Sequence, residues 1–216
     1  MKESINLAIR LFIITGVSAL VLAFANKTTS PIIEQSRQAK YEESLKVAFA
    51  DAESFESLDE GKLKELQAQD ESILDVQIAK KGGSDEGYVY KVVGPGGYAG
   101  DIVIVLGVDS ENKIVGYQVL ESQETPGIGD RITKDEFVGP LMGKSLDQSI
   151  VAAKNPSADN EIQAISGATY STGAATNAIN SAQKASQLLK GNSSSNNSSE
   201  KTLSENKDSE DKKLSL

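Results

Sequence analysis

An uncharged apolar segment near the N-terminus constrains this chain more than any other feature. Residues 11–25 carry no charge, and residues 7–25 form a 19-residue apolar stretch with one charged side chain, Arg10. As a helix, such a stretch spans roughly 28 Å, close to the ~30 Å hydrocarbon core of a bilayer. Arg10 lies near its end, where a long side chain can reach the polar interface. The sequence therefore predicts a transmembrane anchor.

Basic residues set the predicted orientation of this anchor. Lys2 and Arg10 precede the uncharged segment and Lys27 follows it, a weak positive-inside bias that places the N-terminus in the cytoplasm. The protein is then expected in the cell membrane as a single-pass protein with its C-terminal domain extracytoplasmic. The alternative is a cleaved signal peptide, because residues 23–25 match the small-x-small cleavage pattern.

Composition removes most of the chemistry that a catalytic protein would use. The 216 residues include no Cys and no His, which excludes disulfides, thiolate or imidazole metal ligands, and a Ser-His-Asp triad. No spacing of Asp and Glu singles out a metal site, so none is predicted. The net charge of −9 argues against nucleic-acid binding. A redox cofactor in this protein would have to be held by neither sulfur nor imidazole.

Charge and composition divide the chain into three parts. Residues 1–30 are predicted as a cytoplasmic N-terminus and transmembrane anchor, residues 31–190 as an extracytoplasmic domain, and residues 191–216 as a disordered tail. The tail has 8 Ser and 4 Asn in 26 residues and no aromatic residue, so it cannot bury a core. Residues 1–31 carry a charge of +2 and the tail −1, which leaves −10 for residues 32–190. The acidity therefore belongs to the folded domain.

Periodicity in the middle of the chain predicts an α+β domain, an antiparallel sheet flanked by helices. A helix is expected to open at Pro31 and run to about Phe49, with a shorter helix at residues 63–67. Helical character is expected again at residues 134–142, and residues 171–190 form a helix with a face of small apolar residues. Strands are expected at residues 73–79, 87–93, 100–108, 113–120 and 161–165.

Two glycine-rich segments resemble nucleotide-binding loops only superficially. Residues 139–145 miss the P-loop spacing by one residue, since Val138 stands where the first Gly belongs, and they follow a polar helical stretch rather than a strand. Residues 94–100 join two predicted strands, where tight turns account for the glycines. Neither segment is predicted to bind a nucleotide.

Residues 165–172 (ISGATYST) stand between a short predicted strand and a helix. Unpaired N–H groups and the helix dipole favour an anion at such a helix start, and Gly167 and Ala168 would let a phosphate approach the backbone. Hydroxyl donors are offered by Ser166, Thr169, Ser171 and Thr172. The alternative is an ordinary helix cap supplied by Ser171 or Thr172.

This helix start has no cationic help from nearby sequence. No Lys or Arg lies between Lys154 and Lys184, so a free phosphate would rely on dipoles and hydroxyl groups. Covalent attachment would remove that weakness.

Residues 124–130 (ETPGIGD) form a second segment of interest. Pro126 followed by Gly127 suits the central positions of a type II turn. Gly127 and Gly129 flank Ile128 and would let a flat ligand come close to the backbone. Taken alone, the segment is better explained as the loop after the strand at residues 113–120.

Together, the segments E-T-P-G-I-G and S-G-A-T-Y-S resemble the FMN-binding domain family that contains the G subunit of the Rnf electron-transport complex and the C subunit of the sodium-pumping NADH:quinone oxidoreductase. The resemblance covers roughly residues 5–190 and includes the N-terminal span and residues 97–100. It departs from the family at Ser122, where many members carry His, and in the tail at residues 191–216.

The resemblance implies that FMN is bound covalently, by a phosphoester to Thr169, and that a separate flavin transferase forms the bond with FAD as donor. It also implies that the turn lies near the isoalloxazine ring. The candidate cofactor-binding residues are therefore Thr169, Ser166, Gly167, Ala168, Ser171, Glu124, Thr125, Gly127, Ile128 and Gly129.

By this resemblance the chain is the electron-carrying subunit of a membrane-bound, ion-translocating ferredoxin:NAD⁺ oxidoreductase complex. Its partners would be the other membrane subunits, and it would not be a catalyst on its own. Two alternatives remain at this point: a free-standing extracytoplasmic FMN carrier, and a non-redox binding module with no flavin.

Overall fold

A computed structural model describes residues 2–211 of the chain, with side chains for residues 4–190. The chain forms two compact units, Met1–Glu43 and Ser44–Leu216. Most of the first unit is helix α1 (Lys2–Ala48), whose last residues belong to the second. The predicted boundary at residues 30/31 follows from membrane thickness rather than from contacts, and it stays a prediction.

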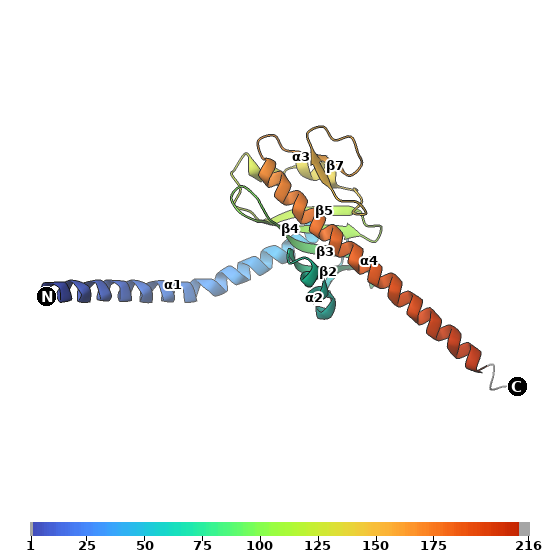
Figure 1. The fold of residues 1–216 in the computed structure, drawn as a ribbon, viewed down its shortest axis with the longest axis horizontal. Helices are drawn as coiled ribbons and strands as arrows, with labels where there is room; N and C mark the ends of the chain where they lie inside the picture. The colour runs from blue at the N-terminus through green and yellow to red at the C-terminus, as the bar shows by residue number, and fades with distance from the viewer. Residues whose placement is uncertain (1, 212–216) are drawn as a thin grey trace. The chain divides into compact units, whose positions relative to one another are not determined.

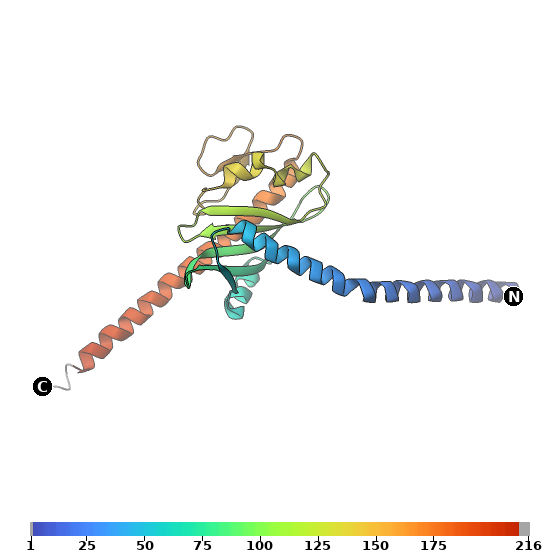
Figure 2. The same cartoon turned by 180° about the vertical axis from the view of Figure 1, so that it is seen from behind.

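Helix α1 is continuous through Pro31, so the expectation that a separate helix opens at this residue is wrong. A proline inside a helix lacks the N–H that would bond the carbonyl four residues back, and kinks are commonly found there. Figures 1 and 2 show that α1 bends partway along its length. The helix therefore tolerates the proline, with a change of direction rather than a break.

The apolar part of α1 is not buried by the residues that the structure describes. Its large side chains are exposed, as Phe12 (78%) and Phe24 (75%) illustrate. Exposed apolar side chains on all sides of a helix are what a lipid environment accommodates. Among the described residues, α1 is the one helix that is long and apolar enough to cross a membrane.

The second unit is built on a five-stranded antiparallel sheet in which neighbours in sequence are neighbours in space. Its strands are β1 (Ser54–Ser57), β2 (Ile73–Lys81), β3 (Ser84–Gly94), β4 (Ile102–Asp109) and β5 (Ile114–Glu121). The four longer strands confirm the predicted ones to within a few residues. Strand β1 was missed because its sequence, SFES, is short and polar and becomes a strand by pairing with β2 at the edge of the sheet.

Helix α4 (Thr169–Asp211) lies across one face of this sheet (Figure 1). Gly94 on β3 permits a close approach of α4 to the sheet, because a Cβ atom at this position would overlap the carbonyl oxygen of Ala174. The helix faces the sheet with small apolar residues, as predicted from the sequence. Buried positions on this face are Ala174, Ala175, Ala178, Ile179, Ala182, Ala185 and Leu189. The main core lies between these residues and the strands.

The opposite face of the sheet receives the end of α1 and the residue after it (Figure 2). Ala48 lies against Gly107 on β4 and Gly116 on β5, and the ring of Phe49 lies against Gly87 on β3. Both residues are buried. The sheet is thus covered on both faces.

Short elements complete the domain. Helix α2 (Glu60–Gln69) starts at Asp59, whose carboxylate accepts hydrogen bonds from the N–H groups of Gly61 and Lys62. Between β5 and α4 the chain forms η1 (Gly129–Thr133), α3 (Asp135–Val138), η2 (Gly139–Leu141), β6 (Val151–Ala153) and β7 (Glu161–Gln163). Strands β6 and β7 pair in parallel. The predicted helical region at residues 134–142 and strand at 161–165 are confirmed, while β6 and η1 were not predicted.

The far end of α4 differs from expectation. Its backbone continues to Asp211, whereas the sequence predicts a helix ending near Lys190. Side chains beyond Lys190 and residues 212–216 lie outside the described set. The disordered tail at residues 191–216 stays a prediction.

Candidate functional site

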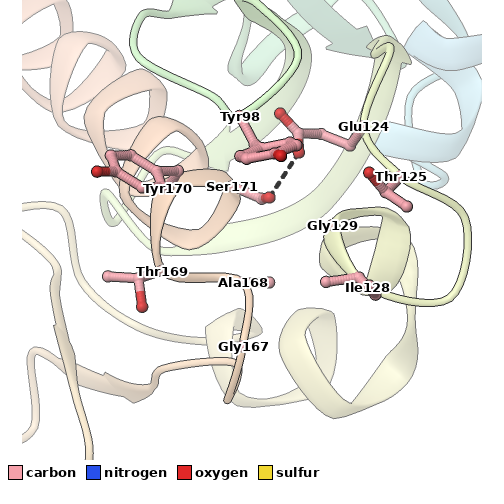
Figure 3. A pocket seen from close by; sticks show the side chains of 10 residues that line it. All are labelled: Tyr98, Glu124, Thr125, Ile128, Gly129, Gly167, Ala168, Thr169, Tyr170 and Ser171. Atoms are coloured by element: carbon pink, nitrogen blue, oxygen red, sulfur yellow. Dashed lines mark hydrogen bonds between the residues drawn. The ribbon is translucent and has the colours of Figure 1, made fainter.

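The two sequence segments singled out above meet around one cavity (Figure 3). It has a volume of about 400 Å³ and lies where the segment after β5 faces the start of α4. Among the described residues it is lined by Tyr98, Glu124, Thr125, Ile128, Gly129, Gly167, Ala168, Thr169, Tyr170 and Ser171. Residues some forty positions apart in sequence therefore share one site.

The segment after β5 forms the predicted turn. The N–H of Ile128 donates to the carbonyl of Thr125 at 3.1 Å, and Gly127 has φ +77°, as the third position of a type II turn requires. The N–H of Gly127 also donates to Oδ1 of Asp130 at 2.6 Å. These bonds fix the turn without using the side chains of Thr125 and Ile128, which line the cavity.

The start of α4 is not capped as an ordinary helix would be. The helix begins at Thr169, and the carbonyl of Ala168 accepts its first hydrogen bond, from the N–H of Thr172 at 2.9 Å. Ala168 has no side-chain oxygen with which to bond the N–H groups of the first turn. The alternative of a cap supplied by Ser171 or Thr172 is therefore wrong, because both residues lie inside the helix. The N–H groups of this first turn lack partners within the helix and favour an anion there.

The hydroxyl groups at this helix start fall into two classes. Ser171 and Thr172 are buried, and their oxygens are used within the protein: Ser171 donates to Glu124, and Thr172 accepts from the N–H of Ile165 at 3.3 Å. Thr169 is exposed and lines the cavity, and among the described residues its hydroxyl makes no hydrogen bond. Among the described Ser and Thr residues of this helix start, Thr169 is the one whose hydroxyl lies at the cavity and is not used in a hydrogen bond.

Glu124 joins the two halves of the site. It is 8% exposed, and its Oε2 accepts a 2.7 Å hydrogen bond from Ser171 Oγ (Figure 3). Its Oε1 accepts from the N–H of Ala99 at 3.2 Å, and its own N–H donates to Ser122 Oγ at 3.2 Å. Ser122, the residue that departs from the family pattern, thus supports the backbone of Glu124.

The sequence did not predict two tyrosines that line the cavity. Tyr98 is 74% exposed and Tyr170 is 68% exposed, more than the other large apolar side chains of the second unit whose exposure is described. A signal was present in the sequence, since Tyr170 follows Thr169 directly and Tyr98 lies in a glycine-rich turn. Of the predicted residues, Ser166 and Gly127 do not line the cavity, although each adjoins a residue that does.

The electrostatics of the cavity come from dipoles and one carboxylate. Among the described lining residues, Glu124 is the one with a charged side chain. Arg131, which follows the turn, makes two hydrogen bonds to Glu136, at 2.6 and 2.9 Å, and this pairing lowers the pKa of the Glu136 carboxyl. The site therefore suits an anionic group at the start of α4 and a flat apolar group against Tyr98, Ile128 and Tyr170, and the exposed Thr169 is part of the same cavity wall.

Comparison with known proteins places this geometry in a family. Residues 97–184, which contain all the lining residues, match the FMN-binding domain. The G subunit of the Na⁺-translocating ferredoxin:NAD⁺ oxidoreductase complex of Acetobacterium woodii is 30% identical over 189 residues, covering 83% of this chain and 89% of that protein. The G subunit of the proton-translocating complex of Clostridium ljungdahlii is 28% identical over 177 residues, covering 82% and 86%.

A solved structure is also similar. The crystal structure of Shewanella oneidensis NqrC shares 26% identity and covers 49% of this chain and 53% of its own, with a TM-score of 0.45. Family membership rests on the sequence relatives rather than on this likeness. By its identity to the Acetobacterium woodii protein over most of both chains, the chain belongs to the family of G subunits of the ion-translocating ferredoxin:NAD⁺ oxidoreductase complexes, the Rnf family.

Proposed function

We propose that this protein is the electron-carrying subunit of a membrane-bound, ion-translocating ferredoxin:NAD⁺ oxidoreductase complex, and that it carries FMN on a phosphoester to Thr169. The observation that carries the proposal is the place of this hydroxyl. It is exposed, makes no hydrogen bond among the described residues, and lies at an uncapped helix start on the wall of a 400 Å³ cavity.

The residues present fit FMN. The first-turn N–H groups of α4 would hold the phosphate, and Gly167 (φ +82°), beside which a Cβ would meet nothing within 4 Å, leaves room for it. Tyr98, Ile128 and Tyr170 offer apolar and aromatic surface to the ring system. A cavity of this size lies within the range of small-ligand sites. When bound, FMN supplies the electron-transfer chemistry, and the protein fixes its position and surroundings.

Covalent attachment suits a site with these contacts. Among the described lining residues no Lys or Arg is present, so dipoles and hydroxyls alone would hold a free phosphate. In the proposed reaction the Thr169 oxygen bonds to the FMN phosphorus of FAD, AMP leaves, and the hydroxyl proton is released. Both oxygens of Glu124 are already bonded within the site, and the chain has no His or Cys to act as base. By the resemblance to the FMN-binding domain family, we assign bond formation to a separate flavin transferase.

The membrane context supports the role in a complex. The relatives are named as subunits of Na⁺- or proton-translocating complexes, and α1 supplies a helix able to anchor this chain. In the proposed arrangement the flavin domain lies outside the cytoplasm and exchanges electrons with other membrane subunits. Tethering the cofactor there prevents its loss by dissociation.

The attachment is tested by co-expressing the full chain with a flavin transferase and detecting flavin fluorescence in the denatured protein on a gel. The wild type is expected to give a fluorescent band, and Thr169→Val, which keeps the branched side-chain shape, to give none. Thr125→Val removes the other threonine hydroxyl of the cavity and is expected to keep the band. A fluorescent band that persists in Thr169→Val would refute the proposed linkage.

Membership of a complex has a separate test. An affinity-tagged full chain, solubilised from membranes of its native host, is expected to copurify with the other membrane subunits and with ferredoxin:NAD⁺ oxidoreductase activity. A free-standing carrier would instead be recovered alone while still carrying covalent flavin.

A further inference from the structure

The carboxylate of Glu124 makes contacts with two segments that are distant from it in sequence. Glu124 lies in the segment after β5; its carboxylate accepts from the N–H of Ala99 in the β3–β4 loop and from Ser171 Oγ in the first turn of α4. A carboxylate that is 8% exposed needs such partners, because burying it without hydrogen bonds is costly. Two donors, one to each oxygen, meet that need.

Two glycines allow this arrangement. A Cβ at Gly97 would overlap the carbonyl oxygen of Gly100 and lie 2.5 Å from Glu124 Oε1, and a Cβ at Gly129 would overlap Oε2 and lie 2.6 Å from Ser171 Oγ. Neither glycine has a positive φ, so its backbone conformation does not explain its presence. Both glycines instead leave space for the carboxylate, which occupies a slot between the β3–β4 loop and the turn after β5.

The same carboxylate determines the charge beside the cavity. Glu124 lines the cavity together with uncharged residues, and Arg131 nearby is paired with Glu136. In a partly buried site with low effective dielectric, a negative charge disfavours the addition of an electron to a neighbouring group.

We propose that Glu124 is the positioning residue of the flavin site: it holds the start of α4, and with it the Thr169 hydroxyl, against the turn after β5, and its charge lowers the reduction potential of the flavin held there. This inference rests on the proposed function. Glu124 acts on Thr169 through Ser171, two residues further along the helix, rather than by taking part in the attachment reaction.

The test uses the full chain in detergent with a flavin transferase and FAD. Three quantities are measured for each variant: the melting temperature without flavin, the rate of covalent flavin incorporation, and the reduction potential once loaded. Glu124→Gln keeps the size of the side chain and removes its charge, whereas Ser171→Ala keeps the charge and removes one hydrogen bond. Glu71→Gln is the matched control, since it makes the same charge change at an exposed residue between α2 and β2.

Each variant has a distinct expected result. Glu124→Gln is expected to slow flavin incorporation by about tenfold, as a misplaced acceptor would, and to raise the reduction potential. Ser171→Ala is expected to slow incorporation similarly and leave the potential close to that of the wild type. Glu71→Gln is expected to change neither. Glu124→Asp, which keeps the charge on a shorter side chain, serves if the Gln variant does not fold, and should slow incorporation while keeping a low potential.

The outcomes separate the two proposals. If Glu124→Gln lowers the melting temperature but leaves the incorporation rate and the potential unchanged, Glu124 is merely structural and the inference is overturned. If the wild type itself takes up no covalent flavin, the proposed function fails and the inference falls with it. A loaded wild type with altered rate and potential in Glu124→Gln, but not in Glu71→Gln, supports both.

Discussion

Gly107 and Gly116 lie directly opposite each other on β4 and β5, and both lie against the backbone of Ala48 at the end of α1. A Cβ atom at either glycine would overlap the carbonyl oxygen of Ala48. Because neither residue has a side chain, the last turn of the helix can contact the backbone of the sheet at this pair.

Enlarging either glycine should therefore destabilise the domain. Gly107→Ala and Gly116→Ala would each force the helix end away from the sheet, at a cost of about 1–3 kcal/mol of unfolding free energy. Gly173→Ala in α4 is the control, since a Cβ there meets nothing within 4 Å and alanine favours a helix. Urea unfolding of the full chain in detergent measures the difference. Equal stability of the Gly107 and Gly173 variants would show that the contact with Ala48 is not tight.

Replacing the cavity tyrosines should change the surroundings of the flavin but not its attachment. A phosphoester holds the group regardless of how well the ring packs, and each aromatic contact is worth only ~0.5–1.5 kcal/mol. Tyr98→Ala and Tyr170→Ala are expected to keep the covalent band and to shift the visible absorption spectrum of the flavin. Val115→Ala, at an exposed position on β5 away from the cavity, should shift nothing. Loss of the covalent band in either tyrosine variant would instead mean that these rings are needed for attachment.

Acid should weaken the contact between α4 and the segment after η2. Asp147 Oδ1 accepts from Asn112 Nδ2 at 2.7 Å, and Asn112 accepts from Ser186 on α4. The hydrogen bonds from Asn112 and Ser145 hold the pKa of the Asp147 carboxyl below its usual 3.8. Its folded pKa is thus below the unfolded value, so the stabilisation is complete above about pH 3.8 and is lost as pH falls through the folded pKa.

Asp147→Asn tests this, because asparagine keeps an acceptor oxygen but cannot titrate. The variant should unfold at a lower temperature than the wild type at neutral pH, and the difference should shrink as the pH falls below 3.8. The melting temperatures of the variant and the wild type, recorded from strongly acidic to neutral pH, give this difference. A difference that stays constant over this range would show that the carboxylate charge contributes no stability.

The orientation of the domain can be measured with reporters. A phosphatase that is active only outside the cytoplasm, fused after Lys190, is expected to be active, and a fluorescent protein that folds only inside should be dark at the same position. Both follow from the basic residues Lys2 and Arg10 before the span. The apparent mass of the mature chain separates an anchor from a cleaved signal peptide, since cleavage after Ala25 would remove the entire span. Activity of the fluorescent fusion alone would reverse the proposed topology.

Local sequence determined much of this protein. The apolar stretch at residues 7–25 has about the length of a membrane span in any context. The strands and the turns between them follow from alternation and glycine placement, and Pro126 with Gly127 is enough to specify the turn after β5. The sequence also predicts the start of the last helix to within two residues, at residue 171 against the observed Thr169. These features depend on neighbours within a few residues, which is why the sequence alone indicates them.

The tertiary structure decided which of these segments contact one another and what each contact does. Strand β1 exists because β2 offers an edge, and α1 runs through Pro31 against the local expectation. Ser171 looks like a helix cap in the sequence, yet in the fold it donates to Glu124, 47 residues away, and leaves Thr169 available. The glycines at 97, 107, 116 and 129 look like ordinary loop and strand residues until their facing partners are known. Such roles depend on close approach between distant segments, and the packing of α4 and α1 on the sheet sets that approach.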